Sequence, residues 1–358
     1  MRLKSLMWND KMQYEIRSRK IVFDAFFRPK AHKMWMVSNF DHATSKFHNV
    51  DAMIDALRNK KFIVNAVIRR DEHAHLYGAT DEWKKMIDYC HANDILPMHY
   101  DFGYFDHYDN YMVDIYDENG KSGIVKDWPN VSDKLDWDSA PDHIKEYRNN
   151  FLEQLNIAKG KDPIDNLESG KYVVIWQQST LKLIRPQFND ILTTDGTAID
   201  VANWINKIVK LVSDMGLTPV VKGEPNIEHW KTLDVNHIQH APIYVNSKSH
   251  LSLGPSARFV RDVNPKLIAH AKFNITCCSS VTNELVMANA PVITMGKSWF
   301  NDLGVFNEPN SWDELFNRAT EINQTNRNKW INWWLSRQAH ADKVTRKITE
   351  VYEKYKGA

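Results

Sequence analysis

The chain has 358 residues, of which 43% are hydrophobic and 25% are charged, and its mean hydropathy is −0.52. This composition excludes a disulfide-stapled miniprotein and a disordered tail, and it is typical of a soluble globular protein of about two domains. Lys and Arg total 46 and Asp and Glu total 45, so the net charge of +1 favours no class of partner.

The first half of the chain contains three short apolar runs that predict strands, at 33–39, 61–68 and 95–104. Helical patterns lie near 50–59 and 81–92. Residues 101–150 carry twelve acids against five Lys and Arg, and they mix Asp, Asn, Pro and Gly with aromatic residues. We expect this acidic stretch to form long, ordered loops.

The second half alternates strand-like and helix-like segments more clearly. Strands are predicted at 171–177, 218–222, 241–246, 273–277 and 291–295, with helical segments between several of them. The helix after the first of these strands has one apolar face, which consists of Val201, Ile205, Ile208, Val209 and Val212. Thr197 and Asp200 could cap its start. The alternation predicts a doubly wound α/β domain.

The C-terminal tail is predicted to be helical. Its apolar stripe consists of Val344, Ile348, Val351, Tyr352 and Tyr355. Three tryptophans, Trp330, Trp333 and Trp334, fall in the helix before it, and we interpret them as core packing.

No apolar run approaches the length of about 18 residues that a membrane span needs, and the N-terminal residues lack the apolar core of a signal peptide. Of the three cysteines, Cys277 and Cys278 are adjacent, and a disulfide between neighbours is strained. We therefore expect a reducing, cytoplasmic location, which for a viral protein is the host cytoplasm.

The segment 270–300 is the most informative for chemistry, because a strand ends in Cys-Ser-Ser and a helix follows directly. Ser279, Ser280 and the free amides of the new helix are expected at the carboxyl edge of the sheet, where the helix dipole favours a phosphate. Glu284 could accept hydrogen bonds from ribose hydroxyls. The alternative is that Ser280 is an N-cap and Glu284 an ordinary first-turn acid.

This segment resembles the C-terminal half of GT-B glycosyltransferases of the capsular-polysaccharide-synthesis type, including Kdo-transferase relatives. The shared residues are Ser279 or Ser280, Glu284, Pro291, Val292, Gly296 and Trp299 or Phe300. Upstream, 220–226 is similar to the family's strand that ends in Lys-Pro-His-Pro, with Lys222 and Pro225 retained and Glu224 in place of the histidine.

The resemblance implies an α/β fold of GT-B type, with two Rossmann-like doubly wound domains facing a cleft and a helical C-terminal tail. The implied limits are 1–165 for an acceptor-binding domain, 166–325 for a nucleotide-sugar-binding domain, and 326–358 for helices that pack back on the N-terminal domain. The donor is a UDP-, GDP- or CMP-linked sugar, held by residues that include Lys222, Glu224 and Gly296.

Other candidate residues lie around these motifs. The segment 101–105 is similar to the acidic-Gly-aromatic motif of the family's N-terminal domain, which makes Asp101 the candidate base; the alternative is a carboxylate that satisfies a turn. Gln177, with Gln178, could bind sugar hydroxyls or simply be polar loop residues. Arg258 and Arg261 could neutralise the donor phosphates or lie on a solvated face.

The sequence contains none of the common motifs for metal, dinucleotide or P-loop nucleotide binding, or for a serine hydrolase. The 15 histidines form no H-E-x-x-H site, and the sequence has no phosphate-binding P-loop, G-x-G-x-x-G turn or G-x-S-x-G elbow. We therefore expect no metal site and no cofactor besides the nucleotide-sugar substrate.

The N-terminal region is basic, with nine Lys and Arg against three acids in residues 1–33. The cations are interleaved with aromatic residues, which suits a polyanion; they include Arg17, Arg19, Lys20, Arg28 and Lys30. The preferred acceptor is therefore a hydroxymethylated pyrimidine in DNA, flipped into the cleft as in viral, bacteriophage-type base glycosyltransferases. The alternatives are a glycan acceptor, a non-catalytic nucleotide-sugar or polysaccharide-binding module, and a sugar-nucleotide epimerase.

Overall fold

The computed structural model describes residues 34–37, 65–69, 88, 91–92, 96–102, 110–116, 122–178, 181, 183–194, 196, 198–223, 241–245, 257–260, 263–298, 301–340 and 343–355. The chain divides into two compact units, which we call unit 1 (residues 1–144 and 328–358) and unit 2 (residues 145–327). The first division lies inside a helix, upstream of the limit at residue 165 expected from the sequence.

Unit 2 is built on a six-stranded sheet of order β10-β9-β5-β6-β7-β8, in which every neighbouring pair is parallel. Its strands are β5 (Tyr172–Trp176), β6 (Thr218–Lys222), β7 (Ile243–Val245), β8 (Ala257–Phe259), β9 (Phe273–Thr276) and β10 (Val292–Thr294). The predicted alternating α/β organisation of this half is confirmed, although β8 was not predicted.

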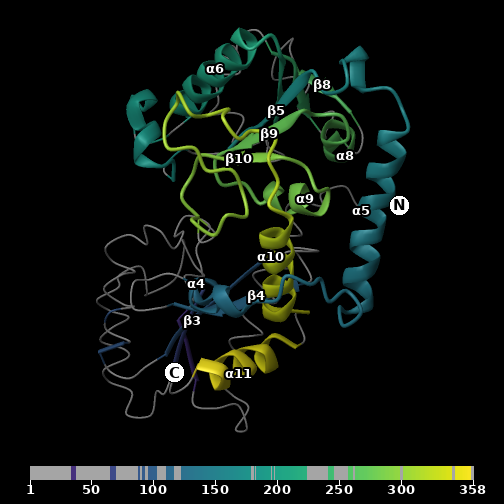
Figure 1. Ribbon diagram of the computed structural model, residues 1–358. Coiled ribbons are helices and arrows are strands. Elements are labelled where there is room, and N and C mark those ends of the chain that lie inside the picture. Colours follow the sequence, from purple (N-terminus) through teal and green to yellow (C-terminus); the bar gives the residue numbers. More distant parts are fainter. Residues whose placement is uncertain are drawn as a thin grey trace, which may run out of the picture. The chain divides into compact units, whose positions relative to one another are not determined.

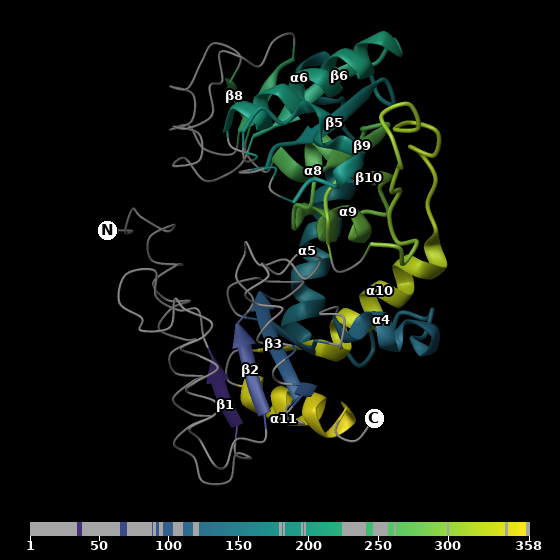
Figure 2. The ribbon, with the colours of Figure 1, turned by 90° about the vertical axis from the view of Figure 1, so that its left-hand side faces the viewer.

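Helices cover both faces of this sheet. Helix α6 (Ala198–Asp214) lies on one face, and α8 (Val263–Ile268) and α9 (Val281–Met287) lie on the other (Figures 1 and 2). The predicted apolar face of α6 is completely buried in the core. Every residue of β5 is buried as well, because a strand covered on both faces needs apolar side chains in both directions. Short 3₁₀ helices, η2 (Ile164–Asn166) and η3 (Pro186–Ile191), flank β5 along the chain.

Unit 1 contains a five-stranded sheet of order β1-β2-β3-β4-β11. Its strands are β1 (Met34–Val37), β2 (Asn65–Arg69), β3 (Leu96–Phe102), β4 (Asn110–Ile115) and β11 (Gln338–His340). The first three strands are parallel and lie side by side in Figure 2, whereas β4 runs antiparallel to both of its neighbours. This sheet is therefore mixed, and the expected cleft between two doubly wound domains stays a prediction.

The prediction that residues 101–150 form only loops is wrong. They contain β4, helix α4 (Gly123–Asp127), the 3₁₀ helix η1 (Trp128–Asn130) and the start of the 18-residue helix α5 (Asp142–Lys159). The buried residues of α5, Ile144, Phe151, Leu155 and Ala158, follow a helical spacing that its many polar residues conceal in the sequence.

The tail forms α10 (Gln324–Arg337), then β11, then α11 (Val344–Tyr355). Its helical character is as predicted, and β11 was not predicted. Trp330, Trp333 and Trp334 are buried and pack on one another at ring-centroid distances of 5.6–6.1 Å, which confirms that they are core residues. Among the described residues, no helix combines the length and the apolar composition that a bilayer crossing requires.

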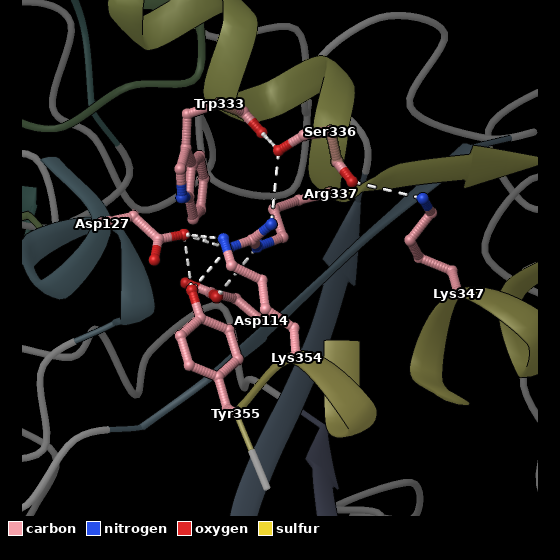
Figure 3. A network of polar contacts seen from close by, with 8 residues as sticks. All are labelled: Asp114, Asp127, Trp333, Ser336, Arg337, Lys347, Lys354 and Tyr355. Atoms are coloured by element: carbon pink, nitrogen blue, oxygen red, sulfur yellow. Dashed lines mark hydrogen bonds and ion pairs between the residues drawn. The ribbon is translucent and has the colours of Figure 1, made fainter. Parts of the chain in front are cut away.

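A buried polar network in unit 1 joins the tail to β4 and α4 (Figure 3). The Arg337 guanidinium, at the end of α10, donates to Asp114 Oδ1 of β4 at 3.3 Å and also to Asp127 of α4. Lys354 and Tyr355 of α11 donate to the same Asp127 carboxylate. The network joins β4 and α4 to α10 and α11, which come from two stretches that are far apart in the sequence.

Candidate functional site

The sheet of unit 2 has a topological switch point between β5 and β9. From β5 the chain continues to β6, β7 and β8 on one side, and it returns to β9 and β10 on the other side. The helices that follow β5 and β9 leave on opposite faces, so the carboxyl ends of these two adjacent strands lie at the position where open α/β sheets bind ligands. The site is therefore expected at residues 177–178 and 277–280.

Residues after the two strands contact each other directly. The Gln178 side-chain oxygen accepts a hydrogen bond from the Cys278 amide at 3.3 Å, and the Cys278 thiol lies 3.5 Å from the same oxygen. The Ser279 amide donates to Thr276 Oγ1 at 3.1 Å. These bonds hold the β9–α9 turn in one conformation beside the end of β5, with Ser279 half-buried and Ser280 exposed.

Three amides at the start of α9 are not free, contrary to the expectation from the sequence. The amides of Val281, Thr282 and Asn283 donate to Ser279 Oγ, to the Ser279 carbonyl and to the Ser280 carbonyl at 3.0–3.3 Å. Moreover, α9 has only seven residues, which limits its dipole. An anion at this turn would therefore have to be held chiefly by side chains.

The turn between β5 and α6, the other conventional phosphate position, is already occupied by a carboxylate of the chain itself. Asp200 accepts hydrogen bonds from the amides of Thr193, Thr194 and Gly196 and from both threonine hydroxyls, at 2.6–3.3 Å. Burial alone would raise the pKa of Asp200, but these bonds outweigh it and lower the pKa to about 2. The amides of Thr193, Thr194 and Gly196, in the described part of this connection, therefore serve Asp200, and the β9–α9 turn is the better candidate.

Several predicted donor residues lie at the carboxyl edge of the sheet. Gln177 and Lys222 are buried at the ends of β5 and β6, where the Gln177 amide donates to the Lys222 carbonyl at 3.0 Å and the Lys222 ammonium donates to the Gly223 carbonyl. Glu284 is half-buried in α9, and its carboxylate accepts a hydrogen bond from Asn264 of α8 at 2.9 Å. Asn264 thus fixes the orientation of that carboxylate.

Gly296 lies at the end of β10 and packs against β9. Its amide donates to the Cys277 carbonyl at 2.8 Å, and a Cβ at this position would lie 2.6 Å from Cys277 Sγ. The structure thus explains this glycine by the close approach of the two strand ends. Whether it also contacts a donor stays a prediction.

We expect Gly296→Ala to lower the free energy of unfolding by about 1–3 kcal/mol, because the new methyl group overlaps the sulfur and backbone of a buried residue. Urea denaturation measures this change. Gly160→Ala is the matched control, since a Cβ there meets no atom closer than 3.7 Å. Equal stability of Gly296→Ala and the wild-type chain would contradict the close packing.

Arg258 is not brought to the switch point. It lies in the edge strand β8, three strands from β5, and its guanidinium forms an ion pair with Asp165 Oδ2 at 2.9 Å. Tyr244 donates to the same carboxylate at 2.8 Å. The hydrogen bond from Arg258 lowers the pKa of Asp165. Arg258 is thus engaged in a contact of the fold, and its expected role at the donor phosphate lacks structural support.

The remaining predicted residues fall wholly or partly outside the described part of the chain. Glu224, Arg261 and the basic acceptor residues Arg17, Arg19, Lys20, Arg28 and Lys30 lie outside the described residues. The backbone of Asp101 lies in β3, paired with Met112 of β4, whereas its side chain is not described. The roles proposed for these residues stay predictions.

Two residues at the edge were not singled out from the sequence. Cys278 contacts Gln178, as described above. Lys297 follows Gly296 directly after β10, and its amide donates to the Leu183 carbonyl at 2.6 Å. The signal available in the sequence was their position immediately after predicted strands, since the carboxyl ends of parallel strands share one edge of the sheet.

No protein-family model matches the sequence, and no curated protein sequence matches it. The solved structures that resemble this chain include two of KpsC from Thermosulfurimonas dismutans. The β-Kdo 2,7-transferase has a TM-score of 0.43 and 14% identity over 86% of this chain and 90% of that chain. The β-Kdo 2,4-transferase has a TM-score of 0.39 and 12% identity over 75% of this chain and 79% of that chain. We therefore argue the function from the residues of the site.

Proposed function

We propose that the chain is a glycosyltransferase that binds a nucleotide-sugar donor at the switch point between β5 and β9. The observation that carries this proposal is the hydrogen bond from the Cys278 amide to Gln178, which joins the segments that follow the two strands. Ser280 is exposed two residues further along the chain. The same turn belongs to the segment whose Ser, Glu and Gly residues resemble GT-B donor sites.

The residues around this edge suit the parts of a nucleotide sugar. Serine hydroxyls, such as that of Ser280, can donate to phosphate oxygens. The Glu284 carboxylate, oriented by Asn264, can accept from ribose hydroxyls. Gln177 and Gln178 carry amides that both donate and accept, as the recognition of sugar hydroxyls requires.

In the proposed reaction, the bond between the sugar's anomeric carbon and the donor phosphate oxygen breaks, and the phosphate leaves with the bonding electron pair. The acceptor hydroxyl oxygen forms the new bond to the anomeric carbon. Its proton passes to a general base, for which Asp101 is our candidate. Groups that stabilise the departing phosphate lower the barrier of this step.

The proposed acceptor is either a hydroxymethylated pyrimidine in DNA or a sugar hydroxyl of a glycan. The DNA acceptor rests on the sequence alone, on the basic residues between 1 and 33. Duplex DNA that carries 5-hydroxymethylcytosine or 5-hydroxymethyluracil, offered with each donor at low and high salt, separates the two. A mass increase on the base supports DNA, and its absence with every donor leaves the glycan.

The donor site is tested with UDP-, GDP- and CMP-sugars, by calorimetric binding and by analysis of hydrolysis or transfer products. We expect binding of one nucleotide class, at least tenfold weaker binding in Glu284→Ala, and loss of turnover but not of binding in Asp101→Asn. If the folded protein binds none of these donors, the proposal is wrong. Unchanged transfer by Asp101→Asn removes only the proposed base, and binding without any turnover indicates a non-catalytic module.

A further inference from the structure

The positive charges of the unit 2 sheet and of its connections differ in how they are engaged. The Arg185 guanidinium donates to the carbonyls of Thr294 and Pro309 at 2.8 and 2.9 Å. The Lys222 ammonium is buried against the Gly223 carbonyl, and Arg258 is paired with Asp165. These three cations therefore serve contacts within the chain.

Lys297 differs from them. Its side chain is half-buried, and within the described part of unit 2 no carboxylate or carbonyl binds its ammonium group. A lysine that is half-buried and unpaired retains a charge that can attract an anion at short range.

The backbone of Lys297 is held firmly at the edge of the sheet. The preceding amide, of Gly296, donates to the Cys277 carbonyl, and the Lys297 amide donates to the Leu183 carbonyl. The following residue, Ser298, is buried and hydrogen-bonded to Asn301. The stem of Lys297 therefore starts from a fixed point one strand away from the β9–α9 turn.

We infer that Lys297 binds the phosphate of the nucleotide-sugar donor. The inference rests on the proposed function and adds to it the cation that the β9–α9 turn itself lacks. The amides of Val281, Thr282 and Asn283 are bonded within the chain, and residues 276–283 contain no Lys or Arg, so a positive charge beside Ser280 has to come from a neighbouring strand end. Lys297, at the end of β10, can supply it as a point charge on a flexible stem.

The test compares each nucleotide with its own nucleoside, because only the nucleotide carries the phosphate. Calorimetry with UDP, GDP and CMP identifies the nucleotide that the wild-type chain binds, and uridine, guanosine or cytidine serves as the matched ligand without phosphate. In Lys297→Ala we expect the Kd of the nucleotide to rise about tenfold to a hundredfold, as for the loss of one hydrogen bond to a charged group. The Kd of the nucleoside should not change.

Two further variants separate charge from packing. Lys297→Arg keeps the charge and should retain most of the nucleotide affinity. Lys272 is an exposed lysine that directly precedes β9, at the amino ends of the parallel strands. The Lys272→Ala variant should therefore bind the nucleotide as the wild-type chain does. Raising the salt concentration should weaken nucleotide binding less in Lys297→Ala than in the wild-type chain.

The outcomes separate this inference from the proposed function. If the wild-type chain binds a nucleotide and Lys297→Ala binds it equally well, the inference about Lys297 is wrong and the donor site stands. An equal loss of nucleotide and nucleoside affinity indicates a general disturbance of the site and also overturns the inference. If the folded wild-type chain binds no nucleotide, both the proposed function and the role of Lys297 are wrong.

Discussion

Replacing Arg337 with Met is expected to lower the free energy of unfolding by about 3–5 kcal/mol. The Arg337 side chain is 5% exposed and lies between the carboxylates of Asp114, which is fully buried, and Asp127, which is 13% exposed. A methionine fills much of the same volume but leaves both carboxylates without this partner. The loss therefore comes mainly from uncompensated buried negative charge rather than from a cavity.

Urea denaturation followed by tryptophan fluorescence measures this loss. Arg346→Met is the matched control, because the Arg346 side chain is 82% exposed and pairs with Glu350 on the surface of α11; its effect should stay within about 0.5 kcal/mol. If Arg337→Met does not fold, Tyr355→Phe removes a single hydroxyl of the same network and should cost about 1 kcal/mol. A loss below 1 kcal/mol in Arg337→Met would contradict the importance of the network.

The same network shows why one part of the fold escaped prediction. The parallel strands of unit 2 other than β8 were predictable because each is a short, mainly apolar run between polar turns. Strand β4 instead has an acid, Asp114, at a fully buried position, which in a sequence indicates a loop. The residue that makes this burial possible, Arg337, lies 223 positions away. No local pattern connects the two.

Like the fold, the candidate site could be predicted only in part from the sequence. The positions of Ser279, Ser280 and Glu284 followed from a strand that ends in small polar residues before a helix, and they lie at the expected edge. The pairing of Arg258 with Asp165 is a tertiary contact between residues far apart in the chain, so the sequence could not indicate it. The α9 amides bond locally to Ser279 and Ser280, and the sequence does not distinguish that conformation from one that leaves the amides free. Lys297 resembles any surface lysine until its neighbours are known.

The stability of unit 1 should depend on pH through Asp114. Burial raises the pKa of Asp114 to about 6, although the charge of Arg337 opposes this shift. In the unfolded chain the pKa is near 3.8, so between these two values the folded state binds the additional proton. The contribution of Asp114 to stability is therefore fully present below about pH 4 and is lost as the pH rises through about 6. Over the whole range it amounts to about 3 kcal/mol.

Asp114→Asn isolates this contribution, because asparagine keeps an oxygen that can accept from Arg337 but carries no titratable proton. We expect the free energy of unfolding of the wild-type chain, relative to Asp114→Asn, to fall by about 1–2 kcal/mol between pH 5 and pH 7.5. Urea denaturation of both proteins at several pH values measures the difference, and the groups common to both cancel in it. A difference that does not change over this pH range would contradict the prediction, because a carboxyl whose pKa is not raised by burial is already ionised at pH 5 in both the folded and the unfolded chain.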